Sequence, residues 1–162
     1  MNGSCGWSSD IFGFNEAETS LIMDSVENFV RDYSQEQLAA WREEISILRN
    51  VASKLVASNA FSREYGIILE YRLPYENRRP DVIVLAKDTV IVLEFKSKSH
   101  ATQADLDQAF DQLCRMLAPG NVVHRGIYSG DKDSLTVFTT IGGLARPEEK
   151  LKELKKLGDL KK

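Results

Sequence analysis

The chain has few of the features that mark secreted, membrane or zinc-finger proteins. Its 162 residues include 2 cysteines, Cys5 and Cys114, and neither stands in a CxxC pair. Neither a disulfide framework nor a structural zinc site is therefore expected. No apolar run approaches the roughly 20 residues that a membrane helix needs, and residues 1–10 lack the basic and apolar regions of a secretion signal. We expect a reducing, cytoplasmic setting.

The chain also lacks an excess of positive charge. Its 21 Lys and Arg residues are outnumbered by 24 Asp and Glu residues, which gives a net charge of -3. A protein that coats nucleic acid through bulk charge is strongly basic, so any nucleic-acid contact must use a local patch. The sequence contains no GxxxxGK[S/T] phosphate loop, which excludes a P-loop ATPase motor from it.

What the sequence does contain is the alternation of helical and strand patterns that is typical of an α/β domain. Apolar residues at helical spacing predict helices at 16–33, 34–58 and 102–118. Asn15, Ser34 and Thr102 are the candidate caps of these helices. Runs rich in β-formers predict strands at 65–73, 81–86, 90–95, 123–128 and 135–140.

Three regions follow from these patterns. Residues 1–33 are expected to form an N-terminal arm and helix, in which an irregular segment docks through its aromatic side chains. Residues 34–145 are expected to form the core, whose strands at 81–86 and 90–95 are apolar on both faces and therefore central in a sheet. Residues 146–162 predict a Lys/Glu-rich C-terminal helix.

The two central strands can be set in register from the sequence. If a short turn is centred on Lys87 and Asp88, Asp81 lies directly opposite Glu94. Directly opposed residues point to the same face, with β-carbons roughly 5 Å apart. Lys96 follows Glu94 by two residues and emerges on that face too. This register therefore gathers two carboxylates and an ammonium at one end of an apolar hairpin.

Such a group of side chains suits metal-assisted hydrolysis. Two neighbouring carboxylates repel each other unless a cation joins them. Mg²⁺ prefers oxygen ligands, usually one or two carboxylates with waters and substrate phosphate. A nearby lysine can position the attacking water or stabilise developing negative charge. Asp81, Glu94 and Lys96 are therefore candidate catalytic residues, with Mg²⁺ as the cofactor and Mn²⁺ as its substitute.

A known signature is similar to this pattern. The sequence reads RPD at residues 79–81, then an apolar strand pair, then EFK at residues 94–96. It resembles the PD-(D/E)XK nuclease signature, in which Pro-Asp precedes one strand and Glu-x-Lys ends the next. The resemblance covers roughly residues 34–140. It implies a restriction-endonuclease-like αβββαβ core with a mixed central sheet flanked by helices, and a nuclease activity on nucleic acid, with DNA favoured over RNA.

A closer resemblance rests on five segments. They are GW at 6–7, QLAAWREEI at 37–45, LEYRLP at 69–74, RRPD at 78–81 and VLEFK at 92–96. Together they look like the N-terminal part of bacterial DNA/RNA helicases of the Schlafen group 3-like type. In that family a nuclease-like domain precedes a helicase motor, so a helicase region or subunit is an expected partner. A glutamine follows the active-site strands in that family, and Gln108 is placed accordingly.

Other polar residues are auxiliary candidates. Glu70 stands in an apolar strand, where an unpartnered charge is costly; it could be a third metal ligand, a partner for Lys96 or an edge residue facing water. Gln108 could orient the substrate as part of the catalytic set. Glu43 or Glu44 could reach the metal from the second predicted helix, although helix-surface glutamates are usually solvated.

Four basic residues near the site are candidate nucleic-acid contacts. Arg72, Arg78 and Arg79 precede the candidate catalytic aspartate, and Lys98 follows the candidate lysine. Arginine forms bidentate contacts with phosphate, and such contacts position a duplex. The alternative, that these side chains merely solvate a loop, is slightly less favoured.

Two other functions remain open at this stage. A catalytically inactive nuclease-fold module could bind nucleic acid or dock a helicase, although a complete Asp, Glu and Lys set argues against decay. A structural domain could use the same charges in a salt-bridge cluster. Metal-dependent cleavage, binding without cleavage, and neither of these would distinguish the three.

Overall fold

The computed structural model describes residues 4–73, 79–86, 89–96, 102–115, 122–129 and 135–142. The chain divides into two compact units, Met1–Ala86 and Lys87–Lys162, and each is described by itself. The division falls inside the predicted core, between two of its strands. The predicted C-terminal helix at 146–162 lies outside the described residues.

The first unit contains the long amphipathic helix that the sequence predicts. This helix, α3 (Gln35–Ser58), begins where the Ser34 hydroxyl accepts a hydrogen bond of 3.2 Å from the Gln37 amide. It ends at Asn59, whose side chain caps the short 3-10 helix η1 (Ala60–Glu64). The apolar stripe of α3 is buried at Leu38, Trp41, Ile45, Leu48 and Ala52. Its last member, Leu55, is partly exposed.

The start of α3 should be sensitive to pH. The Ser34 hydroxyl, followed by the backbone amide of Glu36, lowers the pKa of the Glu36 carboxyl from its ordinary value of 4.5. A lowered folded-state pKa contributes stability above pH 4.5, and this contribution is lost as the pH falls through the folded value. We expect Ser34→Ala to destabilise the unit by about 1 kcal/mol through loss of the helix cap.

Urea denaturation of both proteins at several pH values checks this expectation. The stability difference should be largest near neutral pH and should narrow as the pH falls below 4.5 and through the lowered folded-state pKa of Glu36, since Glu36 is protonated in both proteins only below that value. A difference that grows on acidification would contradict the assignment of the Glu36 pKa to the Ser34 contact.

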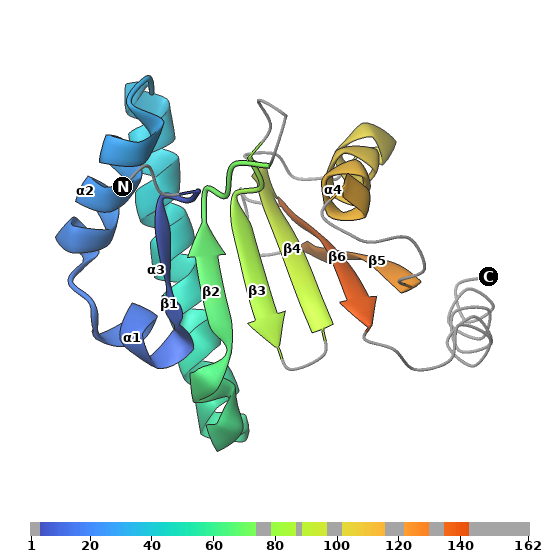
Figure 1. Cartoon of the computed structure of the whole chain (residues 1–162), viewed down its shortest axis with the longest axis horizontal. Coiled ribbons are helices and arrows are strands. Elements are labelled where there is room, and N and C mark those ends of the chain that lie inside the picture. Colours follow the sequence, from blue (N-terminus) through green and yellow to red (C-terminus); the bar gives the residue numbers. More distant parts are fainter. Residues whose placement is uncertain are drawn as a thin grey trace. The chain divides into compact units, whose positions relative to one another are not determined.

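Three antiparallel strands lie against these helices (Figure 1). Strand β2 (Gly66–Leu69) pairs on one side with β1 (Trp7–Asp10) and on the other with β3 (Val82–Ala86). The register sets Leu69 opposite Val82. Alternation along β2 buries Ile67 and Leu69 toward the core, as the period of a half-buried strand requires.

The expectation of an irregular N-terminal arm was wrong. Residues 7–16, before α2 (Thr19–Val30), form strand β1 and helix α1 (Ile11–Glu16), which is capped by the Asp10 carboxylate at 2.6 Å from the Gly13 amide. The proposed Asn15 cap was also wrong, because α2 is preceded by Glu18. The segment does dock through Phe14, which is fully buried, whereas Phe12 is 45% exposed.

The second unit consists of one helix and three strands. Strand β4 (Thr89–Lys96) is followed by helix α4 (Gln103–Arg115), whose Thr102 and Asp105 form the predicted reciprocal cap, with Thr102 N donating to Asp105 Oδ2 at 2.8 Å. Strands β5 (Val122–Ser129) and β6 (Leu135–Gly142) follow. In this unit α4 contacts all three strands.

The α/β class is confirmed, but the predicted mixed sheet is wrong. Within the described ranges of each unit, every pairing is antiparallel: β1 with β2, β2 with β3, β4 with β6 and β5 with β6. The helical crossover from β4 to β5 could have made these two strands parallel neighbours. Instead β6 folds back between them, so each has an antiparallel partner. In the same ranges, no helix is long and apolar enough to cross a membrane.

Candidate functional site

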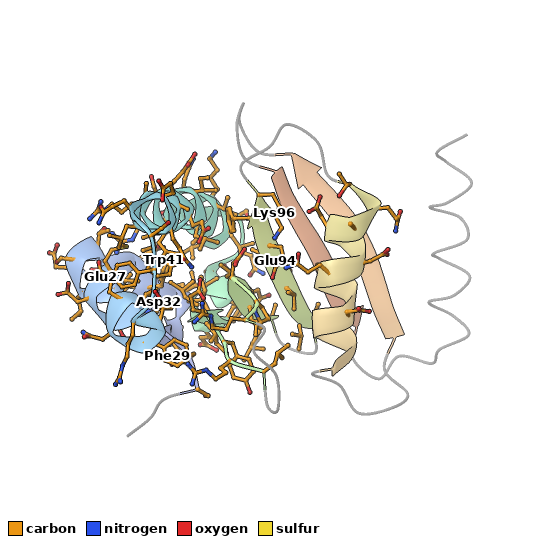
Figure 2. All side chains as sticks on the ribbon, turned by 90° about the horizontal axis from the view of Figure 1, so that it is seen from above. Glu27, Phe29, Asp32, Trp41, Glu94 and Lys96 are labelled. Atoms are coloured by element: carbon orange, nitrogen blue, oxygen red, sulfur yellow. The ribbon has the colours of Figure 1, made fainter. Side chains whose placement is uncertain are left out.

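In the second unit, three predicted site residues meet between β4 and α4. Glu94 and Lys96 are two residues apart on β4, so their side chains emerge on the same face (Figure 2). The Lys96 ammonium lies 3.2 Å from Glu94 Oε2. From α4, Gln108 donates from Nε2 to Glu94 Oε2 at 3.1 Å and accepts at Oε1 from Lys96 Nζ at 3.4 Å.

Burial makes this arrangement costly to build unless its charges are compensated. The Glu94 side chain is 1% exposed, whereas the Lys96 side chain is 24% exposed. A buried carboxylate needs a cation and hydrogen-bond donors to remain charged. Lys96 supplies the charge and Gln108 supplies a neutral donor. Gln108 thereby holds the lysine ammonium beside the carboxylate, whereas the sequence suggested that it orients the substrate.

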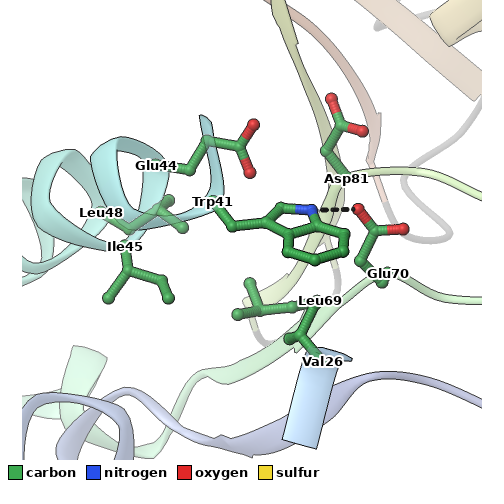
Figure 3. A pocket seen from close by; sticks show the side chains of 8 residues that line it. All are labelled: Val26, Trp41, Glu44, Ile45, Leu48, Leu69, Glu70 and Asp81. Atoms are coloured by element: carbon green, nitrogen blue, oxygen red, sulfur yellow. Dashed lines mark hydrogen bonds between the residues drawn. The ribbon is translucent and has the colours of Figure 1, made fainter. Parts of the chain in front are cut away.

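In the first unit, Asp81 lies at the start of β3 and lines a pocket. Its backbone carbonyl accepts a hydrogen bond of 2.9 Å from the Glu70 amide. Figure 3 shows the carboxylates of Glu44 and Asp81 on one side of the Trp41 ring, with Val26 and Leu69 on the other. Glu70, Ile45 and Leu48 complete the lining. The pocket therefore combines carboxylate oxygens with an apolar wall.

Glu70 does not occupy the place that the sequence predicted. Strand β2 ends at Leu69, and Glu70 turns away with a φ of 53°. Its side chain is buried, so the reading as an edge residue facing water was wrong. Oε1 accepts a hydrogen bond of 2.8 Å from Trp41 Nε1, and Oε2 lies 3.1 Å from Arg79 Nε. Arg79 is therefore a cation partner of Glu70.

Two of the candidate nucleic-acid contacts, Arg79 and Arg72, lie among the described residues, and they differ in exposure. The Arg79 side chain is 26% exposed and ion-paired with Glu70. Arg72 is exposed, with its guanidinium 4.9 Å from the centre of the Phe29 ring. Arg78 and Lys98 lie outside the described residues. An exposed guanidinium can still contact phosphate, whereas one held by a carboxylate first serves the fold.

Trp41 has a role that its helical spacing did not reveal. Its position in the apolar stripe of α3 is typical of a packing residue, and its side chain is only 4% exposed. It also donates a hydrogen bond to Glu70, as a buried tryptophan normally finds a partner for its N–H. The Trp41 ring packs edge-on against Tyr33, with ring centres 5.5 Å apart.

Tyr33 in turn donates a hydrogen bond of 2.8 Å to Glu27. This bond raises the pKa of the Tyr33 phenol, with smaller contributions from burial and the Glu27 charge.

The structure also separates the two neighbouring glutamates of α3. Glu44 lines the pocket with Asp81, whereas Glu43 is exposed. Residues one position apart on a helix do not share a face. Of the two, Glu44 is therefore the one placed to reach a ligand beside Asp81.

Comparison with known proteins gives no family assignment. No family model, curated protein or solved structure matches the chain. The resemblance to PD-(D/E)XK nucleases therefore stays a prediction from the motifs.

The chemistry of the oxygen donors fits a hard divalent cation. Asp81 and Glu44 line one pocket in the first unit, and Glu94 is held by Lys96 and Gln108 in the second. Across the residues with described positions, no group of three or more His, Cys, Asp or Glu side chains is arranged to hold a metal. Mg²⁺ commonly uses one or two carboxylates and fills its remaining positions with water. The predicted pairing of Asp81 with Glu94 joins the two units and stays a prediction.

Proposed function

We propose that this chain is a metal-dependent nuclease that hydrolyses phosphodiester bonds, with DNA as the favoured substrate. The observation that carries the proposal is the buried Glu94 carboxylate held together with Lys96 and Gln108. A carboxylate, an ammonium and an amide on one surface are the groups expected beside a metal-bound phosphate. The Pro-Asp and Glu-x-Lys motifs support the same function.

In this mechanism each residue has a distinct task. Asp81 and Glu94 would hold Mg²⁺ through carboxylate oxygens, with Glu44 as an additional candidate ligand. The ion, when bound, supplies Lewis acidity toward the phosphate and acidifies a bound water. Lys96 stabilises the negative charge that develops on the phosphate oxygens. Gln108 keeps the Lys96 ammonium in place, and the exposed Arg72 contacts the nucleic-acid backbone.

Mn²⁺ binding tests the proposal independently of turnover. We expect one Mn²⁺ per chain, detected by electron paramagnetic resonance, and at least about tenfold weaker binding in Asp81→Asn and in Glu94→Gln. If both carboxylates hold the same ion, the double variant should be little worse than either single variant, since residues that act as a unit are not additive.

A matched pair on α3 provides the control. Glu44→Gln and Glu43→Gln remove the same charge from adjacent positions, but Glu43 is exposed and outside the pocket lining. We expect the first variant to weaken Mn²⁺ binding and the second to leave it unchanged. Cleavage of labelled DNA and RNA by the same proteins then distinguishes an enzyme from a binding module. Absence of Mn²⁺ binding to the wild-type protein would rule out the metal mechanism.

A further inference from the structure

We infer that Glu70 is a positioning residue for Asp81 and is itself held in place by Trp41 and Arg79. This inference rests on the proposed function where it treats Asp81 as a metal ligand. The Glu70 amide donates to the Asp81 carbonyl at 2.9 Å, which extends the β2–β3 pairing one residue past Leu69 and Val82. Asp81 is thus fixed by its backbone at the last step of the ladder.

The conformation of Glu70 needs outside support. Its φ of 53° lies in the left-handed region, which is unfavourable for a residue with a β-carbon. Such conformations persist where surrounding contacts determine them. Both oxygens of the Glu70 carboxylate are engaged, by Trp41 from helix α3 and by Arg79 from the segment before β3. These two contacts hold the bend from opposite directions along the chain.

Arg79 connects the bend to the candidate ligand a second time. It precedes Asp81 by two residues, with the buried Pro80 between them. The Arg79–Glu70 ion pair and the Glu70–Asp81 backbone hydrogen bond therefore connect Glu70 to both ends of the short segment 79–81. Since Pro80 fixes its own φ, few backbone torsions remain free between Arg79 and Asp81.

The same ion pair sets the charge beside the ligand. Glu70 lines the pocket with Asp81 and Glu44, and three uncompensated carboxylates there would repel one another. Arg79 compensates Glu70, so the carboxylate supports Asp81 without competing with it for a cation. The bound guanidinium also explains why Glu70 serves better as a support than as a third metal ligand.

Hydrogen exchange tests the positioning without requiring activity. In Arg79→Met, which keeps an unbranched apolar stem but removes the guanidinium, we expect the Glu70 amide to exchange about five- to tenfold faster, while the β2–β3 ladder amides stay protected. Arg42→Met removes an exposed guanidinium next to Trp41 and should leave exchange unchanged. Unchanged exchange at Glu70 in Arg79→Met would overturn the inference.

The metal requirement provides the second measurement. In Arg79→Met and Glu70→Gln, we expect the Mn²⁺ concentration for half-maximal cleavage to rise about tenfold, with kcat at saturating Mn²⁺ close to that of the wild type. A raised KM for nucleic acid with an unchanged metal requirement would assign Arg79 to substrate binding and overturn the inference. If the wild-type protein neither binds Mn²⁺ nor cleaves, the proposed function fails, and exchange at Glu70 alone decides whether this network holds Asp81.

Discussion

Replacing Lys96 with methionine should lower kcat for metal-dependent cleavage by about 10²–10⁴-fold. Methionine keeps the unbranched apolar stem and removes the ammonium. The lost group lies 3.2 Å from Glu94 Oε2 and 3.4 Å from the Gln108 carbonyl oxygen, so the substitution removes both contacts together with the charge. Steady-state cleavage at saturating Mg²⁺ measures the effect. Lys54→Met, on the exposed face of α3, is the matched control and should cleave normally.

Stability separates this role from that of a structural salt bridge. Removing one partner of a fully buried pair costs roughly 3–5 kcal/mol, and the partial exposure of Lys96 should reduce that cost. In Lys96→Met, Glu94 is left buried without this cation. Adding Glu94→Gln removes the buried charge and should restore much of the lost stability. A functional site predicts that this double variant is stable and inactive.

The opposite result would assign the cluster to the fold. If Lys96→Met cleaves within tenfold of the wild type, the ammonium does not stabilise the reaction. If the protein binds Mn²⁺ but cleaves neither DNA nor RNA, the inactive nuclease-fold module becomes the better description. Each result is read against Lys54→Met, which controls for the loss of one positive charge.

The sequence predicted those features that depend on local periodicity. The stripe of α3 and the Thr102–Asp105 cap follow from spacing along one element, as does the shared face of Glu94 and Lys96. Strand β1 escaped prediction because its residues after Trp7, Ser8 to Asp10, are poor β-formers. Its ladder forms because β2 offers an edge.

Features that depend on distant contacts could not be predicted. Nothing in the run around Glu70 indicates a left-handed residue, since its conformation depends on Trp41, 29 residues earlier, and on Arg79. The antiparallel pairing of the strands in the second unit likewise depends on β6, which lies between β4 and β5. Gln108 reaches Glu94 through the packing of α4, which no spacing rule gives.

Trp41 is where the second large effect is expected. Trp41→Ala should destabilise the protein by about 3–5 kcal/mol, because a large buried side chain leaves a cavity that its neighbours fill incompletely. The side chain is 4% exposed and borders Val26, Ile45 and Leu69 in the pocket wall. Urea denaturation followed by circular dichroism measures the change. Trp7→Phe, at a half-buried position on β1, should cost less than about 1.5 kcal/mol.

Trp41→Phe divides the effect into packing and hydrogen bonding. Phenylalanine keeps an aromatic ring but has no N–H, so Glu70 Oε1 loses this hydrogen bond of 2.8 Å. The loss of a hydrogen bond to a buried acceptor costs about 1–3 kcal/mol. We therefore expect Trp41→Phe to lie between the wild type and Trp41→Ala. A cost below about 0.5 kcal/mol would mean that the hydrogen bond adds nothing beyond packing.

The two tryptophan variants also connect stability to the site. If Trp41 acts on Glu70 through its N–H, Trp41→Phe should speed exchange of the Glu70 amide, as Arg79→Met does, even where the fold is intact. If Trp41 serves packing alone, exchange at Glu70 should follow global stability and no more. The first result would show that helix α3 helps to hold Asp81 in place. The N–H that Trp41→Phe removes lies on α3, and the Glu70 amide that then exchanges faster is the one that binds the Asp81 carbonyl.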